Sequence, residues 1–261
     1  MGDLIPVNVN ADISDSSNKI IVDLFGPASK QLGMALGNVF GLINTVTMPA
    51  KLINEYATRN FENVGEKISQ IPEEKIKPVE PEIAIPLIEK LSYTSNEDLA
   101  NAYVNLLSNA SNIDKMDLVH PGFINKINSM APDEAKLLEI LRERTYVYYI
   151  IVRIQNQKRG YQSLSVKITG LEKELNISPQ QIQMHFENLV SLSIIEDNQG
   201  IYKDDDAGYQ KLIEMYQNEI DQYEEKMKNG DYGDFHEIKI EKSYYALTTI
   251  GSTFIEACIK N

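Results

Sequence analysis

The chain has 261 residues, of which 43% are hydrophobic and 24% charged, so wholesale disorder is excluded and one large or two modest domains are expected. Its 25 lysines and arginines stand against 38 aspartates and glutamates, giving a net charge of -13. A surface this acidic repels phosphate backbones and anionic lipid headgroups, so any binding to nucleic acid or membrane must depend on a local patch.

The single cysteine, Cys258, excludes an internal disulfide framework and is consistent with a reducing cytoplasm. It stands in the apolar run 254–259, where a buried side chain is expected rather than a nucleophile. The N-terminus lacks the basic start and apolar core of a secretory signal. We therefore expect a cytoplasmic protein with a flexible tail over residues 1–22.

The first helical region carries no charged residue over positions 31–50. Within it, Gly33, Gly37 and Gly41 recur at every fourth position, which places them on one helix face and allows another backbone to approach closely. Three interpretations stay open: packing in a buried helical hairpin, self-association into a homo-oligomer, and insertion of 31–50 into a membrane on activation. These three glycines are the first interaction candidates.

An amphipathic helix is predicted over residues 51–70, because apolar residues repeat at helical spacing between charged ones. A connector follows at 71–86, where four prolines favour an extended path over the surface and the last, Pro86, can open the next helix. A clear helix is predicted over 96–109, with Asn96 or Ser95 as its N-cap. Another strong helix begins at Ala131-Pro132.

The run from about Asp23 to Leu141 resembles the Abi-alpha (abortive-infection alpha) family, helical bacterial proteins linked to phage resistance. The resemblance is carried by the glycine-spaced helix, the connector that starts at Ile71-Pro72, the helix after Asn96, and the runs Val119-His120-Pro121-Gly122-Phe123 and Met130–Leu138. It implies a role in phage defence and brings no catalytic residues. For the family motif His120, Pro121 and Phe123 we expect a structural role, with His120 in a turn and Phe123 buried.

No catalytic, cofactor-binding or metal-binding residue is predicted. His185 and His236 lack partners at metal-ligand spacing, and the sequence has no Walker A loop, dinucleotide fingerprint or HExxH motif. Acidic runs such as Asp204–Asp206 are better explained as solvated surface than as a cation site. We therefore expect a protein that is not an enzyme and needs no cofactor.

Residues 146–261 are predicted to form an α+β domain. The run 146–154 is either a strand or the buried end of the preceding helix, and periodicity does not decide between them. Two helices then follow around a turn with Ser178 as N-cap and Pro179 at the first position. With a strand after them and a closing strand and helix start over 244–255, this pattern resembles a winged helix.

The second of these helices stands where a DNA-recognition helix would lie. It offers Gln180, Gln181, Gln183 and His185, whose amides can read adenine edges, but it has no lysine or arginine to anchor phosphate. From residue 146 onward the chain has 12 basic and 18 acidic residues. Nucleic-acid binding is therefore the disfavoured alternative, and a protein-interaction or structural role is favoured.

An insertion at 204–234 separates the strands of the predicted wing. Its apolar residues, among them Tyr216, Ile220 and Tyr223, repeat at helical spacing on a strongly acidic segment. Such a stripe either folds back on its own domain or pairs with a partner helix, and both interpretations stay open. These three residues complete the interaction candidates.

Together, these patterns predict a mainly α protein. A helical domain at 23–145 precedes a winged-helix-like α+β domain at 146–261 that carries a helical insertion in the wing. The predicted function is non-enzymatic phage defence through protein–protein or membrane interaction, with an unknown protein or phage component as partner. The alternative is a winged-helix DNA-binding regulator.

Overall fold

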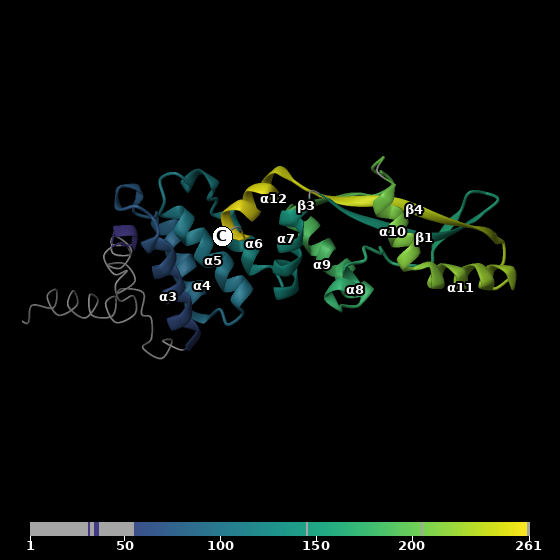
Figure 1. Ribbon diagram of the computed structural model, residues 1–261, viewed down its shortest axis with the longest axis horizontal. Helices are drawn as coiled ribbons and strands as arrows, with labels where there is room; N and C mark the ends of the chain where they lie inside the picture. Colours follow the sequence, from purple (N-terminus) through teal and green to yellow (C-terminus); the bar gives the residue numbers. More distant parts are fainter. Residues whose placement is uncertain (1–30, 32–33, 37–54, 145, 205, 260–261) are drawn as a thin grey trace, which may run out of the picture. The chain divides into compact units, whose positions relative to one another are not determined.

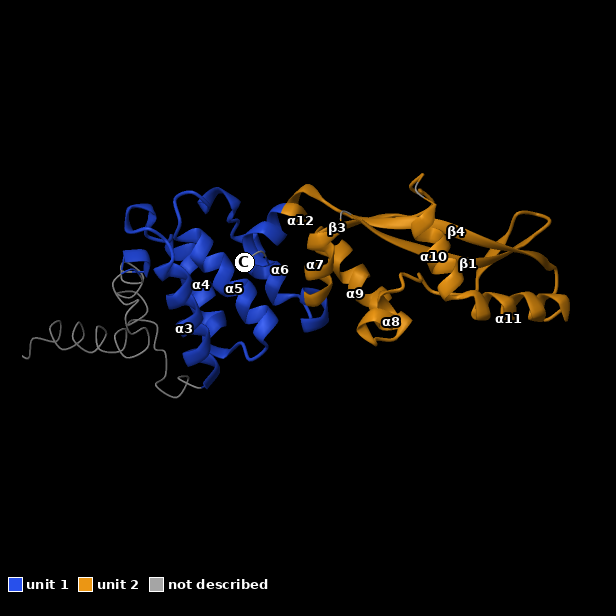
Figure 2. Ribbon diagram, viewed as in Figure 1, with its two compact units in different colours: residues 1–135, 253–261 blue, residues 136–252 orange. Residues whose placement is uncertain are grey.

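The structure, a computed structural model, describes residues 31, 34–36, 55–144, 146–204 and 206–259. The chain divides into two compact units (Figure 2): unit 1 comprises residues 1–135 and 253–261, and unit 2 comprises residues 136–252. Unit 1 is thus assembled from two stretches that are far apart in the sequence. Gly33, Gly37 and Gly41, our first interaction candidates, lie outside the described residues.

Helix α5 is the central element of unit 1, and most of its residues are buried. It contacts α3, α4 and α6 as well as the π-helical turn η5, which comes from the end of the sequence. The described elements of unit 1 (Figure 1) are α3 (Glu55–Ser69), η3 (Glu73–Lys75), α4 (Pro81–Tyr93), α5 (Glu97–Ala110), η4 (Met116–Leu118), α6 (Gly122–Asn128) and η5 (Ile255–Ile259).

The start of α4 differs from the sequence prediction. Pro81 occupies a first-turn position, where a missing N–H costs nothing, and the helix therefore begins five residues before Pro86. Pro86 lies inside the helix, which gives up one main-chain hydrogen bond there. The N-cap of α5 agrees with the prediction, since the Asn96 side chain accepts a hydrogen bond from the Leu99 amide at 3.0 Å.

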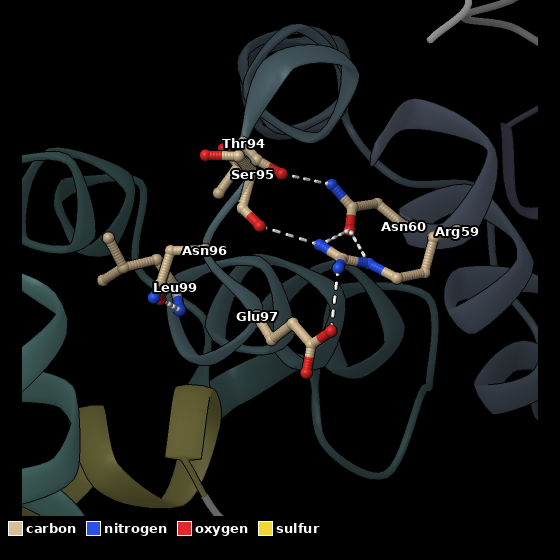
Figure 3. A network of polar contacts seen from close by, with 7 residues as sticks. All are labelled: Arg59, Asn60, Thr94, Ser95, Asn96, Glu97 and Leu99. Carbon is tan, nitrogen blue, oxygen red and sulfur yellow. Dashed lines mark hydrogen bonds and ion pairs between the residues drawn. The ribbon is translucent and has the colours of Figure 1, made fainter. Parts of the chain in front are cut away.

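A polar network holds α3 against the junction between α4 and α5 (Figure 3). The fully buried Asn60 donates from Nδ2 to the carbonyls of Leu91 and Thr94, at 2.9 and 2.8 Å. The neighbouring Arg59 donates to the Ser95 carbonyl at 3.0 Å and pairs with Glu97 at 2.8 Å. Helix ends leave carbonyls without intrahelical partners, and here α3 supplies the missing donors.

Unit 2 is organised around a four-stranded antiparallel sheet of order β2-β1-β4-β3. Helix α7 (Pro132–Glu143) leads into it, and α12 (Thr249–Phe254) leaves it. Its strands are β1 (Tyr146–Asn156), β2 (Tyr161–Ser163), β3 (Ile195–Asn198) and β4 (Phe235–Leu247), and its helices are α8 (Leu171–Leu175), α9 (Pro179–Ser191), α10 (Ala207–Met215) and α11 (Gln217–Lys228).

The centre of the sheet is the long pair of β1 and β4, and β1 is buried on both faces. On one face, Ile150 and Val152 join a hydrophobic cluster that includes Tyr209 of α10. On the other face, Tyr149 lies against Tyr245, whose ring stacks on Phe186 of α9 with centroids 4.4 Å apart. A strand buried on both faces has no alternation of polar and apolar residues, which is why periodicity did not identify it.

The prediction of a mainly α protein is wrong: the protein is mixed α/β. The error came from the two long strands, of 11 and 13 residues. β1 has no strand periodicity, and β4 begins directly after the insertion with the mostly polar run 235–243, so their pairing could not be seen locally. The winged-helix description that went with this prediction is not confirmed.

The segment predicted as an insertion forms α10 and α11, which lie alongside the paired strands β1 and β4 (Figure 1). α10 contacts β1, and α11 contacts β4. Of the two interpretations left open, folding back on its own domain is the one that the structure shows.

Candidate functional site

Unit 2 contains a cavity of about 470 Å³, which we call the unit 2 cavity. Four parts of the sequence form it: β1, the end of β2 with the segment that follows it, the first residues of α9, and the insertion helices. Its volume lies in the range of small-ligand pockets. The described lining residues are Val152, Ser163, Leu164, Ser165, Val166, Ile168, Pro179, Gln180, Tyr216, Glu219, Ile220 and Tyr223.

Tyr216, at the junction of α10 and α11, forms one wall of this cavity. Its hydroxyl donates to Oε1 of the buried Glu172 at 2.6 Å. Burial, and next the hydrogen bond to this carboxylate, raise the pKa of Tyr216 well above its ordinary value, so the phenol stays neutral. On the ring, the ammonium of Lys173 lies 3.9 Å from the centroid.

Glu172 organises the wall behind Tyr216, and sequence reasoning missed it. Its carboxylate also accepts from the Thr169 hydroxyl at 2.7 Å and from the Gly170 amide at 3.1 Å. Three donors therefore satisfy a carboxylate that is only 4% exposed. The available signal was the spacing Thr169-x-x-Glu172 before an apolar residue pattern, which resembles a capping box.

The remaining walls are apolar or weakly polar. Ile220 is buried in the hydrophobic cluster, and the half-buried Tyr223 donates from its hydroxyl to the Leu164 carbonyl at 3.3 Å. Glu219 is exposed and is the single carboxylate among the described lining residues. The cavity therefore suits an apolar or aromatic group whose outer end is either uncharged or positively charged.

The start of α9 is fixed by a capping box beside the cavity. The Ser178 hydroxyl accepts from the Gln181 amide, and the Gln181 side chain accepts in return from the Ser178 amide at 3.3 Å. Pro179 and Gln180 follow this cap directly and line the cavity. The N-cap and first-turn proline predicted from the sequence are thus both present.

Four residues that the sequence marked in two separate groups meet at this one cavity: Gln180, Tyr216, Ile220 and Tyr223. The other candidates for DNA contact are engaged within the protein. Gln181 belongs to the capping box, and Gln183 accepts from the Lys167 amide at 3.1 Å while donating to Glu187 at 2.7 Å. His185 is buried, with 5% of its surface exposed.

The motif residues His120, Pro121 and Phe123 lie in unit 1, and they are placed as a turn that opens α6. His120 Nδ1 accepts from the Gly122 amide at 3.0 Å, which closes the turn. Phe123 is buried and meets Phe254 edge to face, with ring centroids 5.2 Å apart. These contacts hold the turn and the core of unit 1 together, so they have a structural role.

Comparison with known families supplies the context for these features. The family described as abortive infection alpha matches residues 53–258, which is most of the chain. This protein belongs to the abortive infection alpha family. The resemblance seen in the sequence is thereby confirmed from residue 53 to Leu141, and the match continues through unit 2, so the cavity lies within the family region.

Other comparisons add little to the family assignment. No curated protein matches the chain. A similar solved structure is that of an uncharacterized protein from the hydrocarbon-degrading marine bacterium Alcanivorax borkumensis SK2, with 12% identity, a TM-score of 0.34, and coverage of 56% of this chain and 94% of that one. Membership of the abortive infection alpha family points to phage defence of the abortive-infection type, and nothing in these comparisons supports the DNA-binding alternative.

Proposed function

We propose that this abortive infection alpha protein defends its cell against phage without catalysing a reaction, by binding a protein partner at the unit 2 cavity. The observation that carries the proposal is the convergence of Gln180, Tyr216, Ile220 and Tyr223 on one cavity within the family region. A cavity of about 470 Å³ is large enough to take an aromatic side chain from a partner.

Charge favours a basic partner. The insertion at 204–234 contains ten acidic and three basic residues, and Glu219 lies in the cavity lining. The net charge of -13 attracts a basic protein and repels nucleic acid at long range. The expected partner segment therefore pairs an apolar or aromatic anchor with a lysine or arginine beside it.

A non-catalytic role is supported by how the reactive side chains are used. Cys258 is buried, and burial raises the pKa of its thiol, which disfavours the thiolate needed for nucleophilic attack. At the cavity, the Tyr216 hydroxyl and the Glu172 carboxylate are engaged in a hydrogen bond with each other.

Filling the mouth of the cavity tests the proposal. Ser163 in β2 and Gln180 in α9 are exposed lining residues, so Ser163→Trp and Gln180→Trp are expected to fold and to obstruct entry. Gln222→Trp, on an exposed position of α11 outside the lining, is the matched control. We expect wild type and control to reduce the plating of a sensitive phage, and both cavity variants to lose this protection at equal protein levels.

Sequencing of phages that escape the wild-type protein is the experiment that identifies the partner. We expect escape mutations in a phage protein, whose purified form binds the wild-type protein and the Gln222→Trp control but not the two cavity variants. Protection that survives in both cavity variants would refute the site, and failure of the wild-type protein to affect any phage in a broad panel would refute the function.

Membrane interaction is the other route that the sequence leaves open, and it depends on residues 31–50, of which the structure describes 31 and 34–36. Among the described residues, no helix is both long and apolar enough to cross a bilayer. Fractionation of the same infected cells tests this route. The route requires the wild-type protein to be found in the membrane fraction and the Gly37→Leu variant to be absent from it.

A further inference from the structure

Unit 1 contains a second, smaller cleft with a different chemistry. Its volume is about 210 Å³, and it lies between the end of α3 with the following turn, one face of α5, and the turn after α5. Two lysines, Lys67 and Lys115, belong to its lining, together with the amide side chains of Gln70, Asn105, Asn109 and Asn112. No carboxylate is among its described lining residues, although the chain as a whole is strongly acidic.

The two lysines impose a positive potential on this cleft. Lys67 is half-buried, and its ammonium donates to Oδ1 of Asn105. Burial lowers the pKa of Lys67, and the positive charge of Lys115 lowers it further. An anion placed between the two ammonium groups would offset both the lost hydration and the mutual repulsion.

The polar floor of the cleft is already ordered. Asn105 and Asn109, both buried on α5, donate from Nδ2 to the carbonyls of Cys258 and Ala257, each at 2.8 Å. Asn112 accepts from the Asp114 amide at 3.0 Å through Oδ1, which leaves the Nδ2 hydrogens as its donors. A ligand would therefore meet the two ammonium groups and the Nδ2 donors of Asn112 above a floor that needs little further ordering.

We propose that this cleft binds a phosphate group, either free phosphate or the phosphate monoester of a small molecule. A dianion matches two lysines, and phosphate carries about −1.5 to −2 charges near neutral pH. The cleft is smaller than the roughly 300–1,000 Å³ of drug-sized ligand sites, but a phosphate fits it. This site lies in unit 1, so it is independent of the partner site proposed in unit 2.

Calorimetric titration of the full chain with inorganic phosphate, at constant ionic strength in chloride, tests the proposal. We expect Lys67→Met and Lys115→Met each to weaken binding by about tenfold or more, the effect of removing one charge-assisted hydrogen bond. Lys90→Met is the matched control, since it removes the same charge from α4, where the ammonium lies 5.3 Å from the Tyr93 ring centroid and outside the cleft.

Titration with a nucleoside monophosphate distinguishes the source of the phosphate. Tighter binding than that of inorganic phosphate identifies a phosphorylated small molecule, and equal binding identifies the free anion. Thermal unfolding without phosphate checks each variant, and the exposed Lys115 carries the test alone if Lys67→Met does not fold. No binding of either ligand by the wild-type protein, or equal weakening in all three variants, overturns the proposal.

Discussion

At the scale of single residues, Gly251 shows how closely the end of unit 2 is packed. A Cβ atom at this position would lie 1.8 Å from the Ile194 carbonyl oxygen. The contact is fixed by Thr248, whose hydroxyl donates to the Ser193 carbonyl at 2.7 Å and whose amide donates to the Ile194 carbonyl at 3.1 Å. Neither backbone segment can move without breaking these bonds.

Replacement of Gly251 by alanine is therefore expected to destabilise the protein by about 1–3 kcal/mol, the usual cost of overpacking. Urea unfolding of the full chain followed by circular dichroism measures the change. The adjacent exposed Ser252→Ala serves as control and is expected to shift the unfolding midpoint much less. A Gly251→Ala midpoint equal to that of wild type would contradict this close approach.

The residues that the sequence predicted correctly are those with local partners. Asn96 and Ser178 cap helices through backbone groups three residues away, and this spacing is visible in the sequence. Besides its neighbours Thr169 and Gly170, Glu172 binds Tyr216, which is 44 residues away, and Lys67 binds Asn105, which is 38 residues away. Only the folded chain brings such pairs together, so neither the cavity wall nor the cleft could be predicted.

At the scale of elements, the capping box of α9 links local stability to the unit 2 cavity. Ser178→Ala removes the side-chain acceptor for the Gln181 amide and is expected to cost about 1 kcal/mol. Ser178→Asp keeps an acceptor and is expected to retain most of the stability. Thermal unfolding of the three proteins checks this order, and an alanine variant as stable as wild type would show that the cap contributes nothing.

Prediction of elements succeeded for amphipathic helices and for the strand that follows α9, and it failed for the long pair of β1 and β4. The helix predicted over 51–70 matches α3, because one face is apolar and the other charged. β1 combines tyrosines, isoleucines and valines that are buried on both faces, and such a run is compatible with helix or strand. Its partner β4 comes after the whole insertion in the sequence, so no local pattern shows that the two strands pair.

At the scale of the whole molecule, buried tyrosines make the stability sensitive to alkaline pH. Burial raises the pKa of Tyr103, Tyr149, Tyr216 and Tyr245 well above the ordinary value of about 10. Below about pH 10 these phenols are neutral in folded and unfolded chains, so their contribution to stability is complete. Above it the unfolded chain loses protons that the folded chain retains, and stability falls as pH rises.

Tyrosinate absorbance in the near ultraviolet checks this expectation without interference, because the chain has 14 tyrosines and no tryptophan. Tyr103, Tyr149, Tyr216 and Tyr245 are expected to titrate only together with loss of circular dichroism at higher pH. A single reversible step that includes all 14 would contradict the burial of these rings.

The return of residues 253–259 to unit 1 also has a consequence for synthesis on the ribosome. The carbonyl that Asn105 binds belongs to Cys258, 153 residues later in the chain. At translation rates of about 5–20 residues per second, helix α5 is made roughly 8 to 30 s before its last partner exists. During that interval water must make the hydrogen bonds that the Asn105 and Asn109 side chains later make to Cys258 and Ala257. The nascent chain then carries unit 1 without residues 253–261 while all of unit 2 is being made.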